Sequence, residues 1–422
     1  MATQEVRPDA TTFDLQPLED ALDARGLTGI YTRAFIQQLS EATARLRAGD
    51  LTLTHLRSNN SAPDWLRNPL TGAFSPPNPG FRSYSGHWYN SYLRIAAHGY
   101  GKAPDLVVEA RQHDGLIAPP AHVFDPAATC APVQLTSHAP YQDDHLEQKQ
   151  HIWAACQEEF LPSRTHKLLQ LQITSEHLRS GAPRVEKIVC MGLGTLTRQT
   201  GSLEGLDAKH RPYFQHIVAL IIARSLQELY AEHPERYGEQ KSDVRVFAQD
   251  PNYSASDKAV LLENNITVLE DPNGLLAIDE HTFVMSAFPS FPLYEILADM
   301  LPNGPAAIFD ASLPTDGKLG STMRCNEFAA PRVRKMLAGY RIYQFRWDDQ
   351  ELSGMNNKME EALHWLPRMH LFFVGQGDSN TEERNPKMEE DIQKRQDLID
   401  EMFLGGVQLL YQRVLRSVGF QV

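Results

Sequence analysis

The sequence predicts an α/β protein with an open, mostly parallel sheet and helical additions at both ends. Between residues 187 and 312, short β-branched runs alternate with helical segments, which is the pattern of βαβ units. Each of these runs ends in a small or polar turn. The hydrophobic fraction of 42% and the charged fraction of 22% are those of a globular protein. Together these features indicate a Rossmann-like fold.

We expect three domains. Residues 1–140 hold an N-terminal helix, a proline-rich loop and an aromatic-rich lobe, whose aromatic side chains either pack the lobe or stack on a ligand. Residues 141–350 form a Rossmann-type core preceded by a helix with an acidic motif, and residues 351–422 add a strand and a long helix packed on the core. The helices of the two ends are expected at 31–47 and 387–418.

The core elements follow from hydrophobic periodicity. Strands are expected at 187–191, 244–248, 267–269, 282–286, 306–309, 340–346 and 369–374. Helices are expected within 140–179 and at 210–230, 256–264 and 293–301. Because ligands of open parallel sheets bind outside the carboxyl ends of the strands, the functional site is expected at that edge.

The bulk properties limit the class of function. The start of the chain lacks the features of a signal peptide, and no segment reaches the ~20 apolar residues of a membrane helix. The four cysteines form no C-x-x-C pair, so we expect reduced thiols in a cytoplasmic protein with no membrane partner. The net charge of −13 disfavours nucleic-acid binding except at a local basic surface.

One basic stretch, 318–346, stands out in this acidic chain. It carries seven basic residues against Glu327 alone, so 7 − 1 gives a local charge of +6. It is either a solvated helix face or a surface for a polyphosphate. The residues that we assign to such a surface are Arg332, Arg334, Lys335, Arg341 and Arg346.

Candidate ligand-binding residues follow three of the predicted strands. They are Gly192, Gly194 and Thr195 after the first strand, Asp250, Tyr253 and Ser254 after the second, and Ser286 at the end of the fourth. Glycines let the backbone approach an anion, but the third position of G-x-G-x-x-G is Thr197, which argues against a dinucleotide. Asp250 either binds a ligand or caps its turn, and Ser286 is equally open between a ligand contact and a structural role.

An acidic motif, Asp143-Asp144-His-Leu-Glu147, lies at the predicted start of a helix. Asp143 and Glu147 are four residues apart and would share one helix face. The motif is either catalytic or a stabiliser of the first helical turn. The sequence contains no G-x-S-x-G elbow, no phosphate-binding G-x-x-x-x-G-K-[ST] loop and no H-E-x-x-H pair, so we assign no metal and no cofactor.

The sequence resembles two known families. The run Ile188-Val-Cys-Met-Gly-Leu-Gly-Thr, then Asp250-Pro251, Ile266-Thr-Val-Leu and Phe283-Val-Met-Ser, looks like the SRR-like domain over roughly 185–312. With the D-D-x-x-E motif upstream, the chain resembles the fungal arginine-containing cyclodipeptide synthases.

The second resemblance implies an activity. Those enzymes join arginine and a second amino acid, both taken from charged tRNAs, into a cyclic dipeptide at the start of a secondary-metabolite pathway. It implies catalytic roles for Asp143, Asp144 and Glu147, one as a base and another as a partner of the arginine guanidinium. The basic stretch would then contact tRNA. Transfer through a hydroxyl, that of Thr195, Thr197 or Ser202, and direct transfer both remain open.

Two other functions compete with this hypothesis. The chain is alternatively a non-catalytic SRR-like regulator that binds a small ligand or a partner protein. A methyltransferase or reductase on the same fold is disfavoured by the incomplete glycine fingerprint. The sequence leaves the second amino acid and the oligomeric state undetermined.

Overall fold

The computed structural model describes residues 29–47, 86–89, 133–136, 145–196, 210–238, 243–287, 289, 291–310, 330–345, 362–375, 390–395 and 397–398. The chain divides into two compact units. The first combines Met1–Thr136, Phe291–Pro302 and Pro314–Ala338, and the second combines Ser137–Ser290, Asn303–Leu313 and Gly339–Val422. Each is described by itself.

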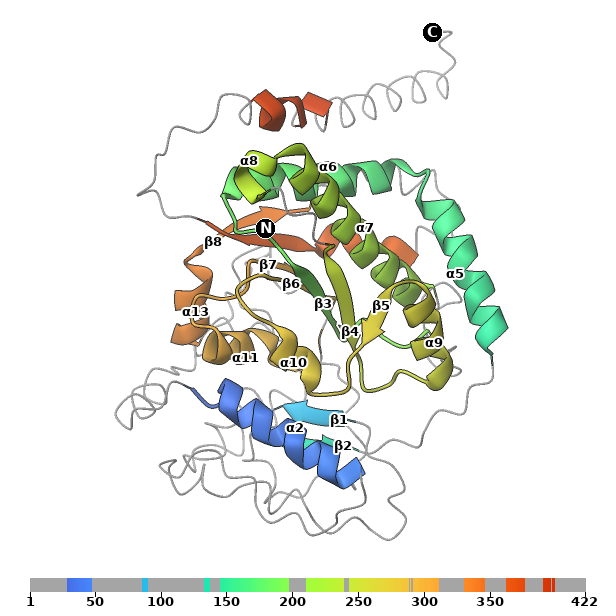
Figure 1. The fold of residues 1–422 in the computed structure, drawn as a ribbon, viewed down its shortest axis with the longest axis vertical. Helices are drawn as coiled ribbons and strands as arrows, with labels where there is room; N and C mark the ends of the chain where they lie inside the picture. Colours follow the sequence, from blue (N-terminus) through green and yellow to red (C-terminus); the bar gives the residue numbers. More distant parts are fainter. Residues whose placement is uncertain are drawn as a thin grey trace, which may run out of the picture. The chain divides into compact units, whose positions relative to one another are not determined.

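The second unit is built on a seven-stranded sheet (Figure 1). Its strands are β3 (Lys187–Met191), β4 (Arg245–Gln249), β5 (Ile266–Val268), β6 (Thr282–Ser286), β7 (Ala307–Asp310), β8 (Tyr340–Gln344) and β9 (His370–Val374). The order is β5-β4-β3-β6-β7-β9-β8. Neighbours from β5 to β7 are parallel, whereas β9 is antiparallel to both β7 and β8. The predicted α/β class with a mostly parallel sheet is confirmed.

The helices of this unit are α5 (Leu146–Phe160), α6 (Arg164–Ser180), α7 (Arg211–Glu232), α8 (Pro234–Tyr237), α9 (Ala255–Glu263) and α10 (Asn273–Ala277). Local sequence sets their ends. Ser163 caps α6 by accepting from the N–H of His166, and Gly181 ends it with a left-handed φ of +75°. Ser254 and Asp257 form a reciprocal capping box at the start of α9.

The two faces of the sheet are covered by different helices. One face presents Ile188, Cys190 and Phe283 to a hydrophobic core shared with α5, α6, α7 and α9 (Figure 1). The alternating residues, such as Val189 and Val284, point to the other face because successive side chains of a strand alternate. The short helix α10 contacts β3 and β4, and its Gly274 N–H donates to the Gln249 side chain on that second face.

The strand order places a switch point between β3 and β6. From β3 the chain adds β4 and β5 on one side, and it then returns to add β6 and β7 on the other side. In open parallel sheets with such a reversal of strand order, ligands bind beside the switch point, outside the carboxyl ends of the strands. The sequence predicts the functional site at this edge.

The first unit contains the described parts of the N-terminal region. Its elements are α2 (Arg33–Arg47), the antiparallel pair β1 (Gly86–Tyr89) and β2 (Val133–Thr136), α11 (Leu293–Met300) and α13 (Pro331–Leu337). The Asp299 carboxylate on α11 accepts from the Tyr31 backbone N–H at 2.7 Å, which fastens the segment leading into α2. The helix expected at 31–47 is confirmed, whereas β1 and β2 were not expected from the sequence.

The element boundaries differ slightly from those expected. Strands β4, β5 and β7 are displaced by one residue, and β8 ends at Gln344 instead of residue 346. Helical residues are described at 390–395 and 397–398 of the expected C-terminal helix, and the proline-rich stretch 59–80 lies outside the described residues. Within the described ranges, no helix combines the length and apolar character needed to cross a bilayer.

Candidate functional site

The turn after β3 is held against the turn after β4. Gly192 and Gly194 adopt φ values of +67° and +85°, a region that L side chains rarely occupy. The Gly194 N–H donates to Asp250 Oδ2 at 2.9 Å, and Asp250 Oδ1 accepts from the Asn252 N–H at 2.9 Å. Burial raises the pKa of the Asp250 carboxyl, and these two hydrogen bonds oppose the rise. Asp250 thus connects the two turns.

A buried lysine on α5 reaches the same turns. Lys149 Nζ lies 2.5 Å from Asp257 Oδ1, 2.9 Å from Ser256 Oγ and 3.1 Å from Ser254 Oγ. Lys149 is 3% exposed and Asp257 is fully buried, so the ion pair is removed from water. The other oxygen of Asp257 accepts from the Thr195 hydroxyl at 2.5 Å and from the Ser254 N–H at 2.9 Å. Asp257 therefore links α5, the turn after β3 and the start of α9.

Tyr253 lies beside this network and contacts a buried histidine. His216 Nδ1 is 2.6 Å from the Pro212 carbonyl, and its Nε2 is 2.6 Å from the Tyr253 hydroxyl. The carbonyl can only accept, so the ring donates from Nδ1 and Nε2 accepts the Tyr253 proton. Burial lowers the pKa of His216 to about 4 and raises that of Tyr253, which keeps both groups neutral near pH 7.

A second set of polar side chains runs across the strand ends on the opposite face. Met191 pairs in register with Gln249, Ser286 with Asp310, and Asp310 with His370. Neighbours in register point to the same face of a sheet. Ser286 donates to the Met191 carbonyl at 2.9 Å across the switch point, and Gln249 Nε2 donates to Asp271 Oδ1 at 3.1 Å.

At these strand ends, the side chains on this face of the sheet change from apolar to polar. The residues two positions deeper on the same face are apolar, namely Val189, Phe247, Val284, Ile308 and Phe372. At the strand ends they give way to the polar Gln249, Ser286, Asp310 and His370, all of which are buried. Burying polar and ionisable groups is unfavourable unless they are paired or serve a function.

The catalytic residues proposed from the sequence are only partly described. Glu147 lies in the first turn of α5 and is exposed, with its side chain pointing away from the buried Lys149. Asp143 and Asp144 lie outside the described residues. Glu147 is therefore two residues from the helix anchor at the carboxyl edge, on the solvent side of the same helix.

The predicted ligand-binding residues gather at the carboxyl edge. Gly192, Gly194, Thr195, Asp250, Tyr253 and Ser254 lie in the linked turns after β3 and β4, and Ser286 lies across the switch point. In this structure Asp250 and Ser254 cap their turn and helix, and Ser286 bonds to the backbone of β3. These hydrogen bonds hold the turns after β3 and β4 and the end of β6 in place at the edge.

The proposed tRNA-binding residues belong to both units. On α13, Arg332 is half-buried and Arg334 and Lys335 are exposed. Arg341 on β8 donates to the carbonyl of Arg179 at 3.2 Å. Arg346 lies outside the described residues.

Four residues of the edge were missed by sequence reasoning. Asp257 had a detectable signal, because Ser254-Ala-Ser-Asp257 is a capping-box pattern. Asp310 directly follows the predicted strand 306–309 but was not singled out as a site residue. Lys149 and His370 had no local signal, since their positions depend on how α5 and β9 pack.

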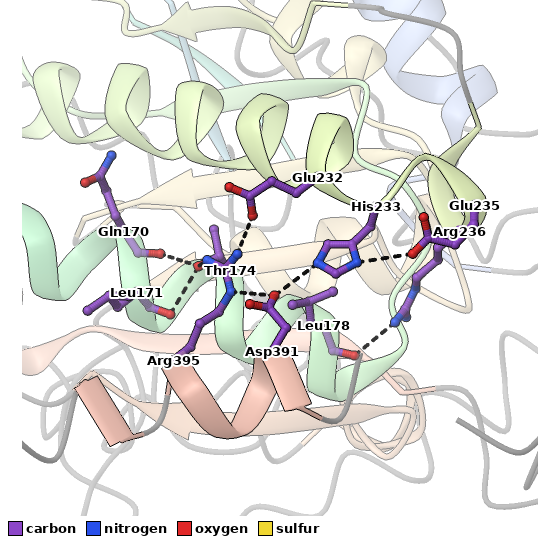
Figure 2. A network of polar contacts seen from close by, with 10 residues as sticks. All are labelled: Gln170, Leu171, Thr174, Leu178, Glu232, His233, Glu235, Arg236, Asp391 and Arg395. Carbon is purple, nitrogen blue, oxygen red and sulfur yellow. Dashed lines mark hydrogen bonds and ion pairs between the residues drawn. The ribbon is translucent and has the colours of Figure 1, made fainter. Parts of the chain in front are cut away.

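A further polar network lies beyond the C-terminus of α7 (Figure 2). His233 Nε2 is 3.0 Å from Asp391 Oδ2 and its Nδ1 is 3.3 Å from Glu235. Arg395 donates to Asp391 at 2.9 Å, to Thr174 at 2.9 Å and to Glu232. Glu232, His233 and Asp391 are close enough to hold a metal ion, but the Arg395 guanidinium already forms ion pairs with both carboxylates. This network ties the 390–395 segment to α6 and α7.

The network lies away from the carboxyl edge. The Tyr230 hydroxyl near the end of α7 accepts from the N–H of Val185, and Arg184 donates to the carbonyl of Tyr237. Both partners immediately precede β3, which begins at Lys187. The Arg395 network therefore belongs to the side where the parallel strands begin, which serves stability more often than ligand binding.

Part of the chain matches a known domain family. Residues 156–343 match the family model of the SRR1 domain. The chain contains an SRR1 domain. The matched range includes β3 to β7 and all of β8 except Gln344; it ends before β9 and begins after Lys149. No curated protein matches the chain.

One solved structure is similar to part of the chain. It is the plantazolicin methyltransferase BpumL in complex with a pentazolic desmethylPZN analog and SAH. The identity is 12% and the TM-score is 0.21, with 55% of this chain and 99% of the methyltransferase covered.

Proposed function

We propose that this protein is a tRNA-dependent cyclodipeptide synthase. It would join arginine from arginyl-tRNA to a residue from a second aminoacyl-tRNA, giving a cyclo(Arg-Xaa) 2,5-diketopiperazine as the first step of a secondary-metabolite pathway. The observation that carries the proposal is the anchoring of α5. Lys149 holds this helix to Ser254, Ser256 and Asp257 at the carboxyl edge, and Glu147 of the D-D-x-x-E motif lies in its first turn.

The chemistry suits a site of this kind. An aminoacyl ester is already activated, so the enzyme mainly holds two esters together and accepts protons. No ATP-binding loop is needed for that reaction. A carboxylate such as Glu147 can form two parallel hydrogen bonds with the guanidinium of the arginyl substrate. Because Glu147 is exposed, it is accessible to a substrate carried on a large RNA.

Two routes of transfer are compatible with the arrangement. In one, the first aminoacyl group moves to the Thr195 hydroxyl, whose proton is directed at the Asp257 carboxylate. In the other, the two esters react directly. The exposed Arg334 and Lys335 of α13 would contact tRNA phosphates in either route.

The proposal is tested by reconstitution. The full-length protein is mixed with tRNA, synthetases, ATP and amino acids, and cyclic dipeptides are identified by mass spectrometry. We expect an arginine-containing product that disappears when ribonuclease is added, and product that survives ribonuclease would contradict the proposal. Absence of product with every charged tRNA would instead favour a ligand-binding SRR1 protein without catalysis.

Two variants distinguish a catalytic role of Glu147 from a general effect of losing an acidic residue on α5. Glu147→Gln should abolish product without unfolding the protein, because it removes one negative charge from an exposed position. Glu158→Gln is the matched control, since Glu158 is exposed on the same helix. If both variants retain wild-type turnover, Glu147 only stabilises the start of α5.

A further inference from the structure

The strand-end row contains an Asp–His pair from two different segments of the chain. Asp310 is the last residue of β7, and His370 is the first residue of β9. They are direct cross-strand neighbours in an antiparallel pair, so their Cβ atoms lie roughly 4.5–5.5 Å apart on one face. The pair adjoins Ser286 at the switch point through the β6–β7 register.

Both side chains are deeply buried, which is unusual for these residue types. Asp310 is fully buried, and His370 retains 6% of its exposure. Among the described residues, His370 Nδ1 is a buried nitrogen without a hydrogen-bond partner. Burial lowers the pKa of His370, an effect that the backbone of Arg368 partly opposes, so the ring is neutral near pH 7. A neutral imidazole can accept a proton.

The pair is not explained as core packing. Two residues further into the sheet on the same face, the corresponding pair is Ile308 and Phe372. Both are apolar and buried. An apolar pair at the strand ends would avoid the cost of burying an ionisable carboxyl and an imidazole. Such pairs at the ligand-binding edge of a parallel sheet are candidates for proton transfer.

We propose that His370 accepts a proton from the amino group of the substrate at the carboxyl edge of the sheet, with Asp310 as the residue that positions and supports it. This inference rests on the proposed function and deepens it. It assigns the base of the reaction to β9, which lies outside the matched SRR1 range, instead of to the acidic motif on α5.

The α-ammonium of one aminoacyl ester gives a proton to His370, and the free amine attacks the carbonyl carbon of the other ester. The C–N bond forms and the C–O bond to the tRNA ribose breaks. The leaving ribose oxygen takes the second proton of the attacking nitrogen, and the proton on His370 passes to solvent. Ring closure repeats the same transfer with the second amino group and the remaining ester.

The groups around His370 set the expected pH dependence. In register, its cross-strand neighbours are Asp310 on β7 and the uncharged Gln344 on β8. A carboxylate beside an imidazole stabilises the imidazolium. Replacing Asp310 by Asn would therefore lower the pKa of His370 and move the acid limb of the rate profile to lower pH.

The test compares variants of the full chain by initial rates of cyclic dipeptide formation from pH 6 to 9. His370→Gln should lower kcat by roughly 10²–10⁴-fold at pH 7, the usual contribution of a general base, with little change in KM for charged tRNA. Its rate should rise with hydroxide concentration, because solvent base then replaces the histidine. The matched control is His364→Gln, at an exposed position six residues earlier, which should retain the wild-type profile.

The outcomes distinguish the two proposals. A wild-type protein that makes no cyclic dipeptide overturns the proposed function, and the assignment of His370 with it. Product formation by His370→Gln at the wild-type rate and pH profile overturns the assignment alone. If that variant does not fold, Asp310→Asn decides, because an acid limb at the wild-type pH would contradict a role for the pair.

Discussion

Replacing the buried Lys149 by Met should destabilise the protein far more than replacing an exposed lysine by Met. Methionine keeps an unbranched apolar side chain of similar length but removes the charge and the three donors. The variant therefore leaves the fully buried Asp257 carboxylate without the cation 2.5 Å from its Oδ1. Ser254 and Ser256 also lose their hydrogen bonds to Lys149 Nζ.

The expected magnitude follows from the burial of the pair. Removing one partner of a buried ion pair costs about 3–5 kcal/mol, because the remaining charge is neither solvated nor paired. The chain offers a control ion pair with the same N–O distance and different burial. Lys258 Nζ lies 2.5 Å from Glu270, but the two side chains are 41% and 47% exposed. Lys258→Met should cost about 0–1 kcal/mol.

Urea unfolding, followed by circular dichroism and tryptophan fluorescence, measures both variants. Lys149→Met should lower the free energy of unfolding by several kcal/mol more than Lys258→Met. Adding Asp257→Asn to Lys149→Met should recover part of the loss, since the stranded charge is then removed. Equal losses in Lys149→Met and Lys258→Met would refute the reasoning that burial makes this ion pair important.

Two further predictions concern pH and the Arg395 network. Burial lowers the pKa of His177 to about 3 and that of His216 to about 4. Between pH 6.5 and 4, these histidines are protonated in the unfolded chain but not in the folded chain. The free energy of unfolding therefore falls on acidification by about 1.4 kcal/mol per pH unit for each histidine. Urea midpoints measured from pH 7 to 4.5 should show this slope. The His177 ring stacks on Tyr237, and replacing it in His177→Phe should reduce the slope. A stability that does not change with pH would contradict the prediction. Arg395→Met should increase amide hydrogen exchange in residues 390–395, because it removes the hydrogen bonds to Asp391, Thr174 and Glu232. Lys394→Met, which removes only an exposed i,i+4 ion pair, should leave the exchange unchanged. Equal protection in the two variants would argue that the network does not anchor this segment.

Much of the core was predictable because its signals are local. The β-branched runs before Gly192 and Ser286 define β3 and β6 with the observed bounds, since a strand buried on both faces requires a continuous apolar run. The glycines after β3 were expected to form a turn, and in the structure Gly192 and Gly194 both have positive φ. The order of strands and helices was sufficient for the fold class.

The candidate site was only partly predictable. The turns after β3 and β4 were expected to lie at one edge because parallel strands end together, and the hydrogen bond from Gly194 to Asp250 agrees with that. The direction of β9 was not encoded locally. His370 begins an apolar run that reads as an ordinary strand, and it reaches the carboxyl edge only because β9 runs antiparallel to β7.

The sequence by itself determined the α/β class, the positions of the strands and the turns that form the carboxyl edge. These depend on side-chain periodicity and backbone preference within a few residues. Tertiary structure decided which distant groups meet there, namely Lys149 with Asp257 and His370 with Asp310. Lys149 and Asp257 are 108 positions apart, and they form a buried pair only because packing removes both from water. The local sequence around either residue does not indicate the other.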